Sequence, residues 1–94
     1  MDKARASAFL VQRVSELVVD VEHMLVGAIA KHALRPSLVR DAQLVRRVQL
    51  QLVRAKQRMA PMDPELAAAK AMWERMSVDE IIATYAKRQR EQEQ

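Results

Sequence analysis

The chain has 94 residues, which allow one small domain at most, and half of them are apolar although it contains only one Phe, one Trp and one Tyr. One glycine and three prolines leave few turn residues for β-hairpins, and the lack of cysteine excludes disulfides and thiolate chemistry. The net charge of +4 is concentrated in residues 35–59, where seven basic side chains stand against Asp41 alone. We therefore predict an all-α protein with one strongly basic segment.

A long first helix is predicted from Asp2 to Leu34, where only Gly27 interrupts helix-favouring residues. Its apolar residues recur in alternating steps of four and three, the spacing of a seam that faces a partner helix as in a coiled coil. The predicted seam is Leu10, Val14, Leu17, Val21, Met24 and Ala28. A second row widens the apolar face to about 140°. This row is Val11, Val18, Leu25 and Ile29. A face so wide is expected to need more than one neighbour.

Pro36 separates this helix from a second one, predicted from about Ser37 to Met59. Its inward seam is expected to be Val45, Val48, Leu52, Ala55 and Met59. Four arginines fall within about 40° on another side of the helix, counting 100° per residue. We call these residues the arginine strip: Arg40, Arg47, Arg54 and Arg58.

Two capping patterns predict shorter helices after the second one. Asp63 followed by Pro64 is typical of an N-cap and first helical residue, and Ser77 with Glu80 three positions on forms a capping box. The predicted architecture is a long antiparallel hairpin plus one or two short C-terminal helices, a small helical bundle. Residues 1–90 are expected to form this single domain, and residues 91–94 a solvated tail.

No catalytic constellation is expected. His23 and His32 are nine residues apart and fall on opposite faces of the first helix, and no glycine-rich loop or placed serine nucleophile is present. The helix lengths and the segment "MDPELAAAKAMWERM" resemble the small all-helical chorismate mutases. That family has an acidic-x-x-Arg-Glu pattern opening its second helix, whereas here Asp41 is followed by Leu44 and Val45. We predict a non-enzyme without cofactor, metal or small-molecule substrate.

A protein-protein interaction module is the first functional hypothesis. Apolar residues outside the hairpin seam are either covered by the C-terminal helices or meet a second copy or another protein. The candidate interaction residues are Val19, Val26, Leu50, Val53 and Trp73. An adaptor, chaperone-like protein or assembly subunit fits this pattern, with self-association into a homo-oligomer or a protein partner expected.

Nucleic-acid binding is the alternative hypothesis, because the arginine strip suits a row of phosphates. Within residues 66–88 the spacing of Ala71, Ser77 and Ile81 also resembles a helix-turn-helix. Arg75 replaces the usual turn glycine in that pattern, and the acidic Asp79 and Glu80 begin the helix that would be the recognition helix.

The longest charge-free apolar run, "MLVGAIA", is too short to span a membrane, so no membrane contact and a cytoplasmic location are predicted.

Overall fold

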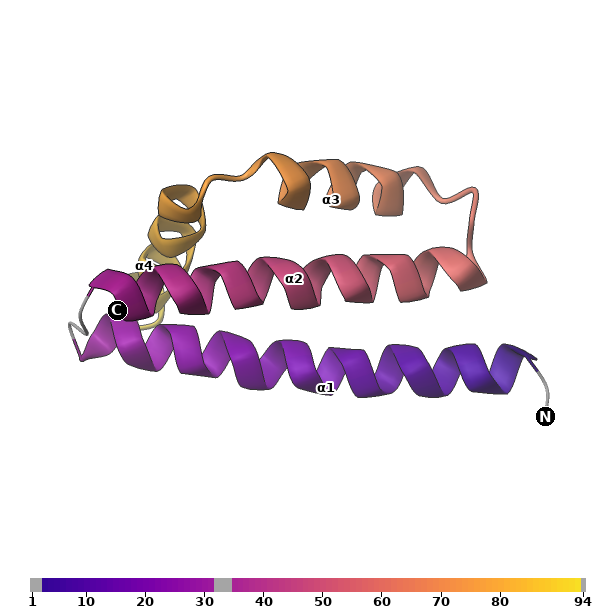
Figure 1. Cartoon of the computed structure of the whole chain (residues 1–94), viewed down its shortest axis with the longest axis horizontal. Helices are drawn as coiled ribbons and strands as arrows, with labels where there is room; N and C mark the ends of the chain where they lie inside the picture. The colour runs from indigo at the N-terminus through magenta and orange to yellow at the C-terminus, as the bar shows by residue number, and fades with distance from the viewer. Residues whose placement is uncertain (1–2, 32–34, 94) are drawn as a thin grey trace.

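The computed structural model describes residues 3–31 and 35–93, which fold into four α-helices and confirm the predicted all-α class. The helices are α1 (Lys3–Ala30), α2 (Arg35–Met59), α3 (Pro64–Arg75) and α4 (Val78–Glu93). Helices α1 and α2 run antiparallel and in contact along the molecule, and α3 returns along the side of α2 that faces away from α1 (Figure 1). Helix α4 packs on both α1 and α2.

Local capping signals set the starts of the two short helices. Asp63 caps α3, and its carboxylate accepts a hydrogen bond from the Glu65 backbone N–H at 2.9 Å. The Ser77 hydroxyl accepts from the Glu80 N–H at 3.1 Å, while the Glu80 carboxylate accepts from the Ser77 N–H at 3.4 Å. Both predicted caps are therefore confirmed, and α4 continues through Glu93, into the segment predicted as a tail.

The core lies where α4 meets the hairpin. Its buried residues come from α1, α2 and α4: Val18, Val21, Leu25, Ala42, Val45, Val48, Ile81 and Tyr85. Helix α3 has no fully buried residue, although Trp73 packs partly buried against this cluster. Polar contacts hold the C-terminal part in place, because the Arg46 guanidinium donates to the Met76 carbonyl and the Tyr85 hydroxyl donates to the Glu22 carboxylate.

The first helix differs from its prediction in two respects. It ends at Ala30, with Lys31 in a turn, and the predicted end at Leu34 lies outside the described residues. Its core side is also shifted from the predicted seam toward the second row. Val21 of the seam is buried with Val18 and Leu25 of that row, whereas the seam residues Leu10, Leu17 and Met24 are exposed. At the far end of the second seam, Met59 is exposed too. The hairpin is as predicted, and the buried residues of α1 all belong to its predicted apolar face, but the exposed half of that face is a departure from the prediction.

Candidate interaction surface

The five residues predicted as an apolar interface do not form one exposed surface. Val53 is only 5% exposed, so it belongs to the interior of the chain. Val26 and Trp73 pack, partly buried, against the core, and Leu50 is partly buried on α2. Val19 is exposed, but on α1. Of the two alternatives left open by the sequence, coverage within the chain therefore accounts for most of this set.

A different apolar row is exposed along α1. Leu10, Leu17 and Met24 follow one another at intervals of seven residues and are 36%, 45% and 54% exposed. Residues seven apart lie on the same side of a helix, two turns from each other. We call these three residues the α1 stripe. Sequence reasoning missed them as a surface because they were assigned to the inward seam.

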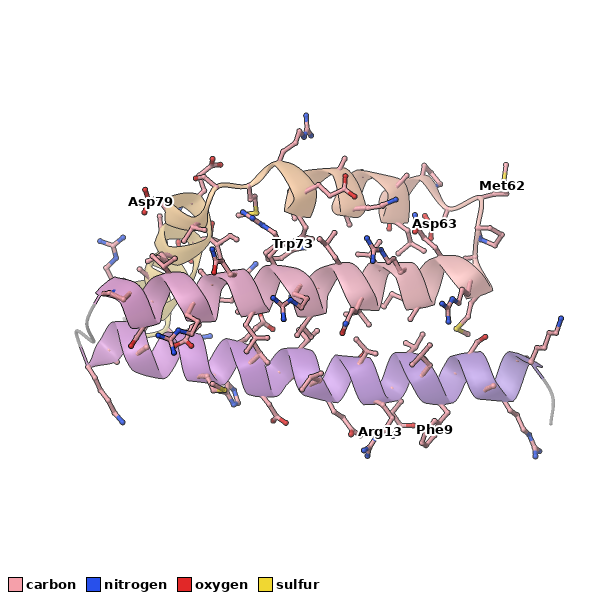
Figure 2. The ribbon with its side chains drawn as sticks, in the orientation of Figure 1. Phe9, Arg13, Met62, Asp63, Trp73 and Asp79 are labelled. Atoms are coloured by element: carbon pink, nitrogen blue, oxygen red, sulfur yellow. The ribbon has the colours of Figure 1, made fainter. Side chains whose placement is uncertain are left out.

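Helix α1 leaves this side open because it has few neighbours. Within the described part of the chain it contacts α2 along the hairpin and α4 near its C-terminal end, and it does not contact α3. Figure 2 shows Phe9 and Arg13 on the side of α1 that points away from α2. Phe9 is the most exposed aromatic residue and lines a hollow of about 640 Å³ with Arg5, Ala6, Ala8 and Gln12.

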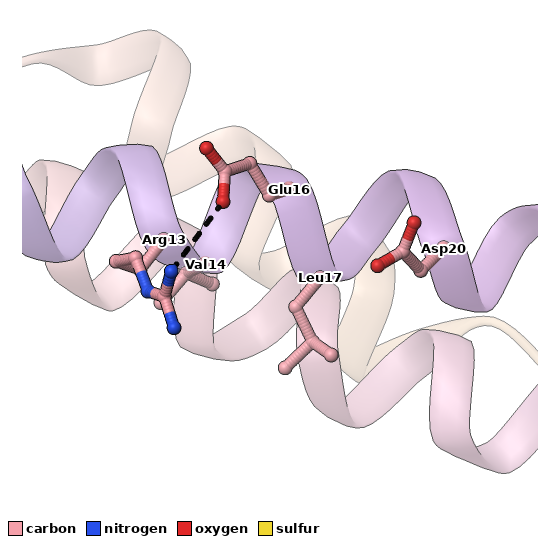
Figure 3. A pocket seen from close by; sticks show the side chains of 5 residues that line it. All are labelled: Arg13, Val14, Glu16, Leu17 and Asp20. Carbon is pink, nitrogen blue, oxygen red and sulfur yellow. Dashed lines mark ion pairs between the residues drawn. The ribbon is translucent and has the colours of Figure 1, made fainter.

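Charged residues alternate with the α1 stripe. Leu17 projects between Arg13 and Asp20 (Figure 3), and these residues line a hollow of about 370 Å³ together with Val14 and Glu16. Arg13 lies 3.9 Å from the Glu16 carboxylate, and more than half of each side chain is solvent-exposed, so this ion pair contributes little. Asp20 forms no ion pair with any other described residue.

Arg54 and Arg58 of the arginine strip border the α1 stripe at Leu10. A shallow depression of about 420 Å³ joins the two helices and is lined by Leu10, Val14, Gln51, Arg54, Ala55 and Arg58. All four arginines of the strip are exposed on α2, as the sequence predicts for one side of a helix. The open face of the hairpin is thus basic along α2 and apolar along α1.

No protein-family model, curated protein or solved structure matches this chain.

The segment compared with a helix-turn-helix has a different geometry. Met76 and Ser77 alone connect α3 to α4, and Met76 is extended, with φ −61° and ψ 131°. In the described structure α3 packs on α2, and α4 packs on α1 and α2. Helices α3 and α4 do not pack on each other. A helix-turn-helix needs a compact turn and a mutual contact between its helices. In the described structure, α3 and α4 therefore do not form a helix-turn-helix.

Among the described residues, no three His, Asp or Glu side chains converge as metal ligands, and His23 is exposed; His32 lies outside the described residues. Burial, followed by the hydrogen bond to Glu22, raises the pKa of the Tyr85 hydroxyl above its usual value. Arg88 lies over the Tyr85 ring, with its guanidinium carbon 5.2 Å from the ring centre, so this tyrosine is part of the contact that attaches α4.

The described helices include none long and apolar enough to cross a membrane.

Proposed function

We propose that the protein is a non-enzymatic interaction module that binds a helical surface of a protein partner through the α1 stripe. The observation that carries the proposal is the continuous row of half-exposed Leu10, Leu17 and Met24 on a helix with an uncovered side. An exposed apolar row with charged neighbours is typical of a docking surface. An adaptor, chaperone-like or assembly role fits this arrangement, in the cytoplasmic location that the sequence predicts.

The energetics favour a modest, specific contact. Covering what remains exposed of each stripe side chain contributes on the order of 1 kcal/mol at about 25 cal/mol per Å². Three such side chains, aligned over four turns, match the apolar row of a facing helix. The charged residues between them, Arg13 and Asp20, add selectivity because a partner must place opposite charges beside them.

Site-specific photo-crosslinking tests the proposal. A photoreactive amino acid replaces Leu17 in one variant and Val19 in the other, in cells that produce the full chain. These two positions are 45% and 49% exposed on different sides of α1, so they form a matched pair. We expect discrete protein adducts at position 17, identified by mass spectrometry, and few at position 19. Equal yields at both positions, or none at position 17, would contradict a docking surface on the stripe.

Nucleic-acid binding is the second candidate, supported by the exposed arginine strip alone. From Arg40 to Arg58 the strip extends about 27 Å at 1.5 Å per residue, enough to lie along several phosphates. The helices that follow supply no recognition element, because α4 begins with the acidic Asp79 and Glu80. Aromatic residues that would stack on bases do not line the hollows beside the strip.

A further inference from the structure

We infer that the partner of the α1 stripe is a second copy of this chain, bound with its α1 antiparallel to the first. This inference rests on the proposed function, since it names the occupant of the same surface. It comes from the order of side chains along the exposed side of α1: Leu10, Arg13, Leu17, Asp20 and Met24. Apolar residues alternate there with charges of opposite sign.

The apolar part of this row is symmetric about Leu17. Leu10 precedes Leu17 by seven residues and Met24 follows it by seven. When two copies of α1 cross antiparallel at Leu17, the two Leu17 side chains meet at the two-fold axis. Leu10 of each copy then lies opposite Met24 of the other. All three residues of the stripe are thus covered by stripe residues of the other copy.

The charged part of the row is complementary under the same operation. Arg13 stands four residues before Leu17 and Asp20 three residues after it, so in the antiparallel pair they differ by one residue, about 1.5 Å along the axis. Both also lie on the same flank of Leu17, about 40° and 60° away at 100° per residue. A two-fold axis perpendicular to the helices brings equal flanks together. Each Arg13 therefore faces Asp20 of the other copy, twice per dimer.

The neighbouring charges select this arrangement over others. A parallel pair puts the flanks that carry Arg13 and Asp20 on opposite sides of the contact, so the two attractive contacts between these residues are lost. Arg54 and Arg58 of the arginine strip border the opposite flank of the stripe beside Leu10, so full face-to-face packing of two hairpins brings the two basic α2 helices together. This repulsion restricts the contact to α1. A contact made by one helix from each copy is at the small end of stable interfaces, so a weak dimer is expected.

Charge reversal at the two positions tests the inference. Sedimentation equilibrium is measured on the full chain from about 1 to 500 μM, the range in which small interfaces dissociate. Arg13→Asp and Asp20→Arg, each alone, should weaken the dimer about tenfold, because each turns two attractive contacts into repulsive ones. The double variant, with the charges exchanged, should recover the parental dissociation constant. An equimolar mixture of the two single variants should form a heterodimer.

Two apolar variants serve as a pair of controls. Leu17→Ser should abolish the dimer because the residue lies on the two-fold axis, whereas Val19→Ser should leave it unchanged at similar exposure. Circular dichroism verifies that every variant stays helical. If neither the double variant nor the mixture restores the dimer, the antiparallel pairing is overturned.

The inference and the proposed function fail in different ways. A parental chain that stays monomeric up to about 500 μM, the weak limit for an interface of this size, overturns the self-association. If position 17 still crosslinks to other proteins in cells, the interaction module stands with a different partner. If the dimer forms but depends on Leu50 and not on Leu17, the stripe is not its contact, and the inference is equally overturned.

Discussion

Tyr85 joins α4 to α1 through a single buried hydroxyl. It is 4% exposed, donates its hydrogen bond to the Glu22 carboxylate, and has the Arg88 guanidinium over its ring. Arg88 also lies 3.9 Å from the same carboxylate. Because the phenol is buried next to a negative charge, its protonated form is favoured and its pKa is raised. This small cluster fixes how α4 docks on the hairpin.

The raised pKa predicts how stability depends on alkaline pH. Below about pH 10 the phenol is protonated in both folded and unfolded chains, so this group adds no pH dependence. Above that pH the unfolded chain loses the proton while the folded chain keeps it, and the free energy of unfolding falls as pH rises. Tyr85→Phe removes the hydrogen bond, so it should lower the free energy of unfolding by about 1 kcal/mol at neutral pH. In this variant the free energy of unfolding should not show the decrease above about pH 10 that Tyr85 causes in the parent.

The measurement uses the fact that the chain contains one tyrosine. Tyrosinate absorbance of the native protein should appear at a higher pH than that of the protein in denaturant, where it should appear near pH 10. Urea unfolding of the parent and of Tyr85→Phe at pH values on both sides of 10 gives the free energies. Native tyrosinate formed at the same pH as in denaturant would show that the hydroxyl is not buried against Glu22.

At the scale of a helix, the capping box of α4 predicts opposite effects for two hydroxyls. Ser77→Ala removes the acceptor of the Glu80 N–H and should reduce the free energy of unfolding by about 1 kcal/mol. The Thr84 hydroxyl instead donates to the Glu80 carbonyl, at 2.8 Å, from within the helix. Because alanine has the higher helix propensity, Thr84→Ala should be neutral or slightly stabilising. Urea unfolding of both variants measures these changes. Equal losses of the free energy of unfolding would mean that the capping box does not stabilise the start of α4.

The helices and caps could be predicted from sequence because their signals are local. Asp63 with Pro64, and Ser77 with Glu80, act within one turn, so the structure confirms both. Which side of α1 is buried depends instead on where other helices pack. The row through Leu10, Leu17 and Met24 lies about 100° around the helix from Val18 and Leu25, so burial of that pair leaves the row exposed. The sequence does indicate that α1 needs more than one neighbour, because its predicted apolar face is about 140° wide.

The candidate site could be predicted only in part for the same reason. The arginine strip needs nothing beyond the helical repeat, and all four of its residues are exposed as predicted. Val53 was placed at an interface because it lies outside the seam of α2, yet it is buried within the chain. Long-range packing of this kind leaves no trace in the spacing of apolar residues.

Over the whole molecule, charge is separated between helices. The basic residues gather on α2, whereas residues 60–94 carry more acids than bases, including the acidic first turns of α3 and α4. The open face of the hairpin therefore has a positive potential although the net charge is only +4. Such a face attracts polyanions whether or not its function is to bind them, so salt dependence must separate the two cases.

The last prediction concerns a short random DNA duplex. If the strip makes four phosphate contacts, the logarithm of the binding constant should fall with the logarithm of the salt concentration with a slope of about −3.6. The double variant Arg47→Gln with Arg54→Gln should halve this slope. Lys56→Gln with Lys87→Gln removes the same charge outside the strip and should alter the slope less. As an interaction module, the chain should bind the duplex only at low salt, and the arginine variant should keep the parental solution mass. Binding that persists near physiological salt and is lost in the arginine variant would instead make nucleic acid the primary partner.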